Sequence, residues 1–224
     1  MLIAEDLLLL LLEDDSGRLT NRTYLDTGLG GALLVELALG EHVQVAESSG
    51  WWGRAKVQPT AAPPPGDPLL VEALALVAER ERTAQELVGR LGKNRREPLL
   101  ERLVSSGALQ RRDDRILGLF PRRRWPARDL AHKADLRRRL GDAIVRGVSP
   151  EPRTAALVAV LSAMELAHKV VHLDGLSGRE AKARAKEIAD GDWAAKAVKD
   201  AIRAAQAAMT AAAAAGAATA ATSG

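Results

Sequence analysis

The chain has 224 residues, 47% of them hydrophobic, which is enough to bury a sizeable core in one domain. It contains no cysteine, which excludes disulfide bonds and thiol chemistry and favours a reducing compartment. The net charge of +3 conceals a segregation, because residues 1–79 carry 4 basic and 12 acidic side chains and residues 80–147 carry 19 and 9. This basic block in the middle of the chain favours an anionic partner.

The first segment, "MLIAEDLLLLLLEDD", predicts a buried helix rather than a membrane span. Its uninterrupted apolar run covers only residues 7–12 and is flanked by acidic residues, whereas a spanning helix needs about 20 apolar residues. A signal peptide would also begin with positive charge. We therefore expect any membrane contact of this chain to be peripheral.

Helical spacing dominates the next part of the chain. The segment "GLGGALLVELALG", from Gly28 to Gly40, predicts a mostly apolar helix, and "HVQVAE" after it predicts a short strand. A proline-rich connector then leads into a helix that begins at Pro68. Thr83 and Glu86 have the spacing of a capping box that opens a further helix, and one more helix runs from residues 94–97 to residue 107.

The segment "GALQRRDDRILGLF" predicts a β-hairpin, because two short apolar stretches flank residues 113–115. Residues 111–129 hold seven arginines together with Phe120, the only phenylalanine, and Trp125. The order helix, helix, hairpin is also that of a winged-helix module, so nucleic-acid binding is the alternative function. The second helix offers chiefly Arg102 for base contacts, and its other cations precede it, which suits phosphate contact without base readout.

The last third predicts an arginine-rich helix after Pro126, an evenly apolar helix over residues 154–172 and two amphipathic helices that divide near Gly191. From residue 209 an Ala-rich, low-complexity tail follows, and we expect residues 209–224 to be disordered. The expected fold is mainly α: a single helical domain with an apolar central helix bundle surrounded by amphipathic helices, plus a short β-hairpin.

The sequence offers little support for catalysis or for a bound metal or cofactor. His168 and His172 lie four residues apart, but no glutamate follows the first, and the surrounding segment is strongly apolar. The "GLGG" segment lacks the spacing of a dinucleotide fingerprint and the Gly-Lys-Ser/Thr of a P-loop, so close helix packing explains it better. We expect a protein that is not an enzyme.

Four segments in order resemble the Golgi phosphoprotein 3 family: "LIAEDLLLLLLEDDSGR", "GLGGALLVELALGEHVQV", "DPLLVEAL" and "LLERLVSSGAL" with the hairpin after it. The similarity runs from about Leu2 to Ala208, and the first two segments are the specific ones. The resemblance implies one mainly helical domain over residues 1–208. The Ala- and Arg-rich composition suits a bacterial member from a GC-rich genome, as in actinobacteria.

The resemblance also implies a function. Eukaryotic members are peripheral membrane proteins that bind phosphatidylinositol 4-phosphate and act as adaptors, holding the cytosolic tails of glycosyltransferases. We therefore expect a lipid-binding protein at the cytoplasmic face of a membrane, with anionic phospholipid as its partner and membrane proteins as clients.

The family's lipid pocket uses a tryptophan, an arginine in a Gly-Leu-Arg-Gly turn and two arginines three residues apart. The last two fall on Lys93 and Arg96, which the resemblance implies as headgroup-binding residues, although Lys supplies a point charge where Arg supplies a bidentate fork. Gly30 replaces the turn arginine and Asn21 the tryptophan, so the sequence does not predict which headgroup is bound. The family's hairpin, associated with membrane insertion and self-association, implies six membrane-contacting residues here: Leu119, Phe120, Arg122, Arg123, Arg124 and Trp125.

Overall fold

Repeated apolar stretches at helical spacing give nine α-helices within the part of the chain that the computed structural model describes, residues 1–20, 24–46, 56–116, 120–191 and 196–222. They are α1 (Ile3–Leu11), α2 (Leu25–Leu39), α3 (Pro68–Ala78), α4 (Ala84–Gly92), α5 (Arg96–Ser105), α6 (Ala131–Ile144), α7 (Pro152–Ala163), α8 (Gly178–Asp190) and α9 (Lys196–Thr222). Together with two small β-sheets they form one mainly α domain, which confirms the predicted fold class.

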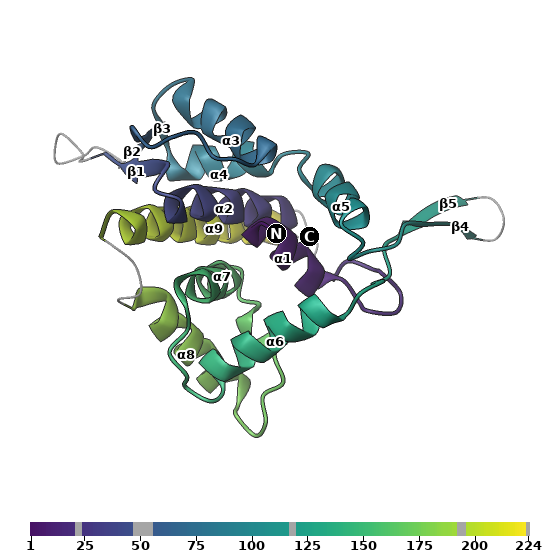
Figure 1. The fold of residues 1–224 in the computed structure, drawn as a ribbon. Coiled ribbons are helices and arrows are strands. Elements are labelled where there is room, and N and C mark those ends of the chain that lie inside the picture. The colour runs from purple at the N-terminus through teal and green to yellow at the C-terminus, as the bar shows by residue number, and fades with distance from the viewer. Residues whose placement is uncertain (21–23, 47–55, 117–119, 192–195, 223–224) are drawn as a thin grey trace.

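The centre of the domain is the pair α2 and α9, and α1, α4 and α7 pack around it (Figure 1). Every residue of α1 is buried, and α2 is buried around nearly its whole circumference. Helices α3, α5, α6 and α8 lie further out. The predicted apolar bundle with amphipathic helices around it is therefore present.

The two helices α2 and α4 touch through glycine. A Cβ atom added to Gly30 would lie 1.9 Å from the carbonyl oxygen of Val88, and one added to Gly92 would lie 1.7 Å from that of Asp26. Neither position can carry a side chain without separating the helices. This confirms that the "GLGG" segment serves close packing rather than a phosphate cradle.

Two helix starts follow their predicted chemistry. The Thr83 hydroxyl accepts a hydrogen bond from the Glu86 amide at 3.3 Å, and the Glu86 carboxylate accepts one from the Thr83 amide at 3.2 Å. This confirms the capping box. At the start of α3 the Asp67 carboxylate accepts from the Leu69 amide at 2.9 Å, and Pro68 occupies the first helical position.

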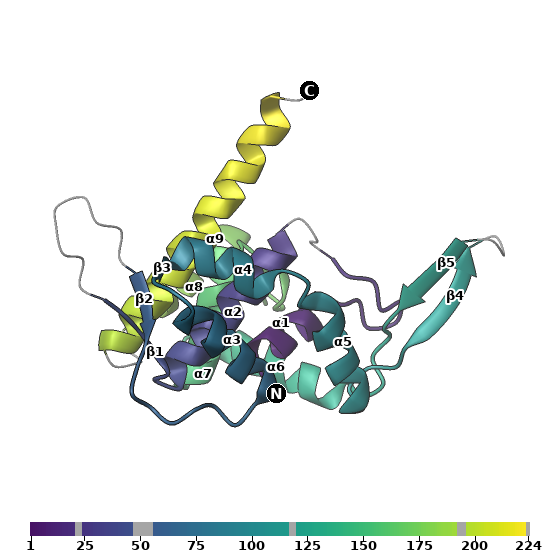
Figure 2. The same ribbon diagram turned by 90° about the horizontal axis from the view of Figure 1, so that it is seen from above.

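The larger sheet has the order β1 (Val43–Val45), β2 (Lys56–Pro59) and β3 (Arg82–Thr83), all antiparallel. Only β1 was predicted from the sequence. A hairpin is present as β4 (Arg112–Ile116) and β5 (Phe120–Arg124), but residues 113–115, which were expected between the strands, lie within β4, with Asp113 opposite Arg123. It projects from the helical body in both ribbon views (Figures 1 and 2).

Two predictions for the last third differ from the structure. Residues 154–172 do not form one helix: α7 ends at Ala163, Glu165 adopts a left-handed φ of 55°, and a short 3₁₀ helix follows at Ala167–Lys169. The Ala-rich tail is helical as part of α9, which leaves the body in Figure 2. Alanine has the highest helix propensity, which favours this helix, and Met209 at the start of the tail is buried in the core.

Candidate anion-binding surface

Lys93 and Arg96 lie in the tight turn that joins α4 to α5. Lys93 ends α4, Asn94 adopts the left-handed conformation with a φ of 59°, and Arg96 is the first residue of α5. The Arg95 amide donates to the Gly92 carbonyl oxygen at 3.2 Å and closes the turn. Because asparagine tolerates positive φ, the chain can reverse within these few residues. The turn therefore presents both predicted headgroup residues at the start of one helix.

Two features place positive charge at the start of α5, although Glu97 in its first turn lies 3.8 Å from Arg96 and offsets part of it. Within the described part of the chain no side chain caps it, so the first-turn amides leave partial positive charge at this end. Lys93 is exposed and forms no ion pair with any residue that the structure describes. Arg95, in contrast, is held by Glu72 at 2.7 Å. An anion at this turn would meet Lys93 and helix amides together.

Arg96 is supported by a buried aromatic ring. Its guanidinium carbon lies 5.7 Å from the ring centroid of Trp125, within the range of a cation–π contact. Trp125 is only 4% exposed, and its amide donates to the Gly17 carbonyl oxygen at 3.3 Å. Gly17 has a φ of 59° and lies so close to Trp125 that no side chain fits there. The ring therefore forms a fixed platform beneath Arg96.

This position corrects the membrane contact predicted for Trp125. The ring belongs to the hydrophobic core, since Trp125 is 4% exposed and packs among core residues, and it cannot reach a lipid in this conformation. Its indole Nε1 has no hydrogen-bond partner among the described residues, so packing and the Arg96 contact account for the position.

The hairpin and the α5 turn come together at the hairpin's base. Arg123 lies 3.9 Å from Asp113 and 4.0 Å from Glu97 in the first turn of α5. Arg124 is half-buried. Leu119 and the side chains of Phe120 and Arg122 lie outside the described residues, so their predicted lipid contacts stay predictions. The structure thus gathers Lys93, Arg96 and Arg123 around the start of α5, and we call these three residues the α5 cationic surface.

The two replaced pocket positions behave differently. Gly30 is buried against α4, where a Cβ would also lie 2.7 Å from the Gly92 amide nitrogen. An arginine at this position would require α2 and α4 to move apart. Asn21 lies outside the described residues.

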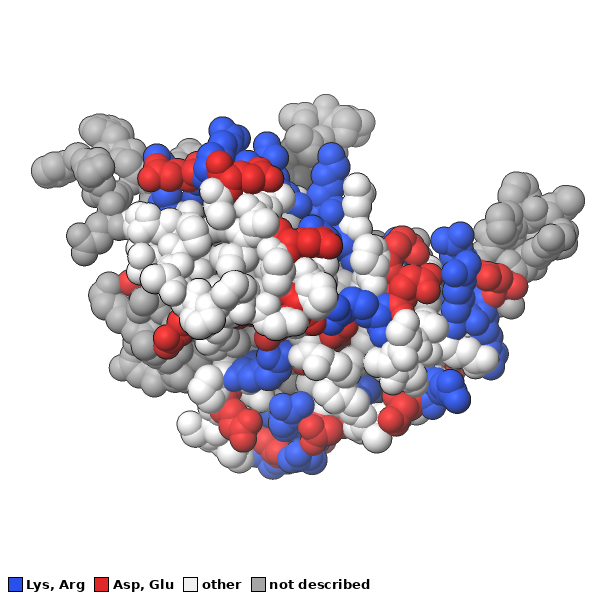
Figure 3. All heavy atoms as spheres, turned by 45° about the horizontal axis from the view of Figure 1, so that its top comes forward, with Lys and Arg blue, Asp and Glu red and all other residues white. Residues whose placement is uncertain are grey.

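Part of the basic block is paired with the acidic first third of the chain, and sequence reasoning missed this. Glu5 and Asp6 are 4% and 3% exposed, so each needs cationic partners. Figure 3 shows basic and acidic side chains interspersed over one face. The described pairs between a base of the block and an acid of the first third are Arg102 with Glu5 (2.8 Å) and Asp67 (2.6 Å), His132 with Asp6 (2.8 Å), Arg137 with Asp14 (2.8 Å), Arg82 with Glu79 (2.8 Å), Arg95 with Glu72 (2.7 Å), and Lys133 with Asp14. The signal that could have indicated this was two acids inside a leucine-rich helix.

These pairs shift the pKa values of their members. Burial raises the pKa of Asp67, but hydrogen bonds from Arg102 and the Leu69 amide outweigh it and leave that pKa below its usual 3.8. Burial lowers the pKa of Lys133, and the hydrogen bond to Asp14 opposes this. Hydrogen bonds to Glu5 and Asp67 raise the pKa of Arg102, so its charge is fixed in the pair.

The paired state of Arg102 bears on the nucleic-acid alternative. A winged-helix reading needs Arg102 to point at base edges, but its guanidinium is bound to Glu5 and Asp67. In addition, β3 pairs with β2 and not with the β4–β5 hairpin. The element order is that of a winged helix, but Arg102, the residue expected to contact base edges, is bound to two carboxylates of the same chain.

The described residues contain neither a membrane-spanning helix nor a cluster of metal ligands. No helix among them is both long and apolar enough to cross a bilayer. The same residues contain no cluster of three or more His, Asp or Glu side chains arranged to hold a metal ion.

The fold and the surface define a mainly helical domain with a projecting hairpin and a cationic surface where a helix begins beside it. The sequence profile of the Golgi phosphoprotein 3 (GPP34) family matches residues 3–205, and the chain belongs to this family. A comparison with curated proteins gave no match.

Proposed function

We propose that this protein is a non-catalytic peripheral membrane protein that binds acidic phospholipid headgroups through the α5 cationic surface, at the cytoplasmic face of a membrane. The observation that carries the proposal is Arg96 held over Trp125 at a helix start, next to Lys93, which forms no ion pair with a described residue. Membership of the GPP34 family supports it. Each basic residue near an anionic leaflet contributes about 1 kcal/mol, which is about fivefold in binding.

The surface favours recognition of charge over recognition of one headgroup. Lys93 is a point charge on a flexible stem, and no side chain can project from Gly30 toward a headgroup. Preferential binding of phosphatidylinositol 4-phosphate would then follow from its extra phosphate charge. We therefore propose that vesicles of equal surface charge bind this protein about equally, whichever anionic lipid supplies the charge.

Vesicle sedimentation tests the proposal. Recovery is compared on neutral, phosphatidylinositol and phosphatidylinositol 4-phosphate vesicles, at low and at high salt. Lys93→Ala should weaken binding to anionic vesicles about fivefold, and salt should weaken it further. Lys186→Ala is the matched control, because Lys186 is exposed on α8 and forms no ion pair with a described residue. Equal, salt-insensitive recovery on every vesicle would contradict the electrostatic mechanism.

Two further roles are proposed with the family as their support. The first is an adaptor role, in which the membrane-bound protein holds client membrane proteins. Affinity purification from membranes of the native host tests it, and no enriched membrane protein would contradict it. The second is self-association through the hairpin, whose two strands leave both edges of the β4–β5 sheet open. A sedimentation velocity profile that stays monomeric at all concentrations would contradict this second role.

A further inference from the structure

The outer face of α3 is apolar. Val71, Ala75 and Ala78 are exposed at the spacing of one helix face, and Leu74 on the same side is half-buried. Val71 is 44% exposed, which is high for a large hydrophobic side chain. We call Val71, Leu74, Ala75 and Ala78 the α3 apolar stripe.

The connector before α3, residues 60–67, extends this apolar surface. Pro63 and Pro64 are exposed in it, and so is Pro68 at the start of α3. Figure 3 shows a continuous area of uncharged residues over the connector and α3. An apolar area of this kind on a globular domain marks contact with another surface.

The α3 apolar stripe lies on the same face of the molecule as the start of α5. In Figure 2, α3, α4 and the start of α5 face the viewer together. Glu72, which follows Val71, pairs at 2.7 Å with Arg95, and Arg95 stands between Lys93 and Arg96 in the turn from α4 to α5. This ion pair holds the stripe beside the two residues proposed to bind headgroups.

The two carboxylates of α3 that border the stripe are both paired. Glu72 is bound to Arg95, and Glu79 is bound to Arg82 at 2.8 Å. Neither pair adds net negative charge beside the stripe, so the apolar surface can approach an anionic leaflet together with the cations of the turn.

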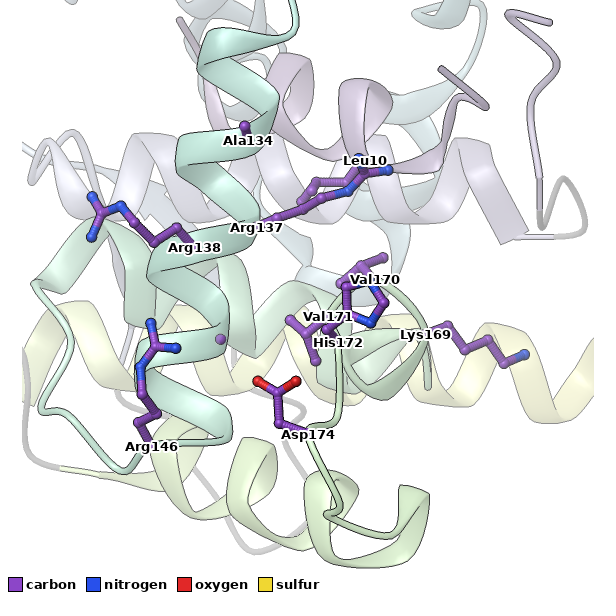
Figure 4. Close-up of a pocket in the computed structure, with 11 residues that line it drawn as sticks. Leu10, Ala134, Arg137, Arg138, Arg146, Lys169, Val170, Val171, His172 and Asp174 are labelled. Carbon is purple, nitrogen blue, oxygen red and sulfur yellow. The ribbon is translucent and has the colours of Figure 1, made fainter. Parts of the chain in front are cut away.

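The side of the molecule that carries α6, at the bottom of Figure 1, lacks this combination. A cavity of about 640 Å³ lies there between α6 and the turn of residues 169–174 (Figure 4). Its arginines do not converge in the close-up, and they are bound within the chain, Arg138 by Asp135 and Asp142 and Arg146 by Asp142. These arginines offer little to an anionic surface.

We propose that the α3 apolar stripe enters the headgroup region of the bilayer and is the apolar anchor of this protein, beside Lys93 and Arg96. Peripheral proteins bind through buried apolar area and charge together. Trp125, the ring expected as an anchor, is buried in the core. The inference rests on the function proposed above and adds to it the part of the surface that enters the lipid.

A single-cysteine label tests the proposal, because the chain contains no cysteine. Val71→Cys of the full chain is coupled to the environment-sensitive fluorophore NBD and mixed with vesicles that contain phosphatidylinositol 4-phosphate. The emission should rise and shift to the blue, and acyl chains brominated near the headgroup should quench it. Val148→Cys is the matched control, because Val148 is an exposed valine beside Arg138 and Asp142 on the α6 side, and its label should not respond.

Vesicle sedimentation gives a second measurement. Val71→Ser should weaken recovery on anionic vesicles about threefold, as expected when roughly half of a valine side chain leaves an apolar environment. Val148→Ser should leave recovery unchanged. The factor for Val71→Ser should persist at high salt, whereas the factor for Lys93→Ala should shrink, because salt screens charge and not apolar burial.

The proposal is overturned if the Val71 label does not respond to vesicles that bind the protein, or if the Val148 label responds equally. It is also overturned if the Val71 label is already shifted to the blue without vesicles and sedimentation velocity shows a dimer, because a second copy would then cover α3. Each of these results leaves the proposed function intact as long as Lys93→Ala weakens binding. If no anionic vesicle binds the protein, the proposed function and this inference fail together.

Discussion

Replacing Trp125 tests two roles for its ring. The structure makes it a buried platform beneath Arg96, whereas the sequence predicted a membrane anchor. The ring is 4% exposed and contacts Arg96 from below. Removing a buried tryptophan or phenylalanine side chain to alanine costs about 3–5 kcal/mol. For a chain of this length each kcal/mol lowers Tm by about 2–4 °C, so Trp125→Ala should lower it by roughly 6–20 °C.

Trp125→Phe should cost about half as much. It keeps an aromatic ring beneath Arg96, and the indole Nε1 that it removes has no hydrogen-bond partner among the described residues. Urea denaturation followed by far-UV circular dichroism measures both variants. The phenylalanine variant should bind anionic vesicles almost as well as the wild type, because Arg96 keeps its support.

Fluorescence gives the decisive test of the platform. A variant in which Trp51, Trp52 and Trp193 are replaced by phenylalanine reports on Trp125 alone. Vesicles with brominated acyl chains should bind this variant without quenching its emission, since a core ring cannot reach the acyl region. Quenching by these vesicles, or a loss of less than about 1 kcal/mol in Trp125→Ala, would refute the platform.

Three further predictions concern the pairs and the helix contact. Arg102→Met should destabilise the fold by about 3 kcal/mol, because it leaves the buried Glu5 without its cation. In urea denaturation the double variant with Glu5→Gln should recover part of this loss, and losses that simply add would contradict the pair. Gly30→Arg should cost at least about 3 kcal/mol by overpacking α2 against α4, and should not improve selectivity for phosphatidylinositol 4-phosphate on vesicles. The pKa values of Asp14 and Asp67 are lowered in the fold, so their stabilisation is complete above pH 3.8 and is lost as the pH falls through the lower folded values. The free energy of unfolding of Asp14→Asn and Asp67→Asn should therefore fall less steeply with decreasing pH than that of the wild type. An unchanged pH dependence of stability would count against these two ion pairs.

Elements with strong local signals could be predicted from the sequence. The leucine run of α1 and the capping box of Thr83 depend on neighbours within a few residues, whereas the hairpin was expected with its turn at residues 113–115, which lie within β4. Strands β2 and β3 could not be predicted, because they are short and are stabilised by pairing with distant segments. The break after α7 was missed because hydrophobic spacing continues past Glu165, whose positive φ has no signature in the sequence.

In the candidate site, too, local features could be predicted and features that depend on distant segments could not. Lys93 and Arg96 were predicted, and the turn between α4 and α5 does bring them to one helix start. Trp125 is buried among core residues and its backbone is held by Gly17, a segment that approaches it only in the folded chain. An arginine-rich segment with aromatic rings predicts a surface, but the sequence does not show which ring the rest of the chain covers.

The ion pairs between the acidic first third and the basic block also bear on biosynthesis. Synthesis proceeds from the N-terminus, so Glu5, Asp6 and Asp14 exist before any of their partners. Arg102, His132 and Arg137 therefore meet an existing counter-charge as they leave the ribosome. A circularly permuted chain in which the basic block is made first would present these cations before their counter-charges exist, while keeping the same contacts in the final fold.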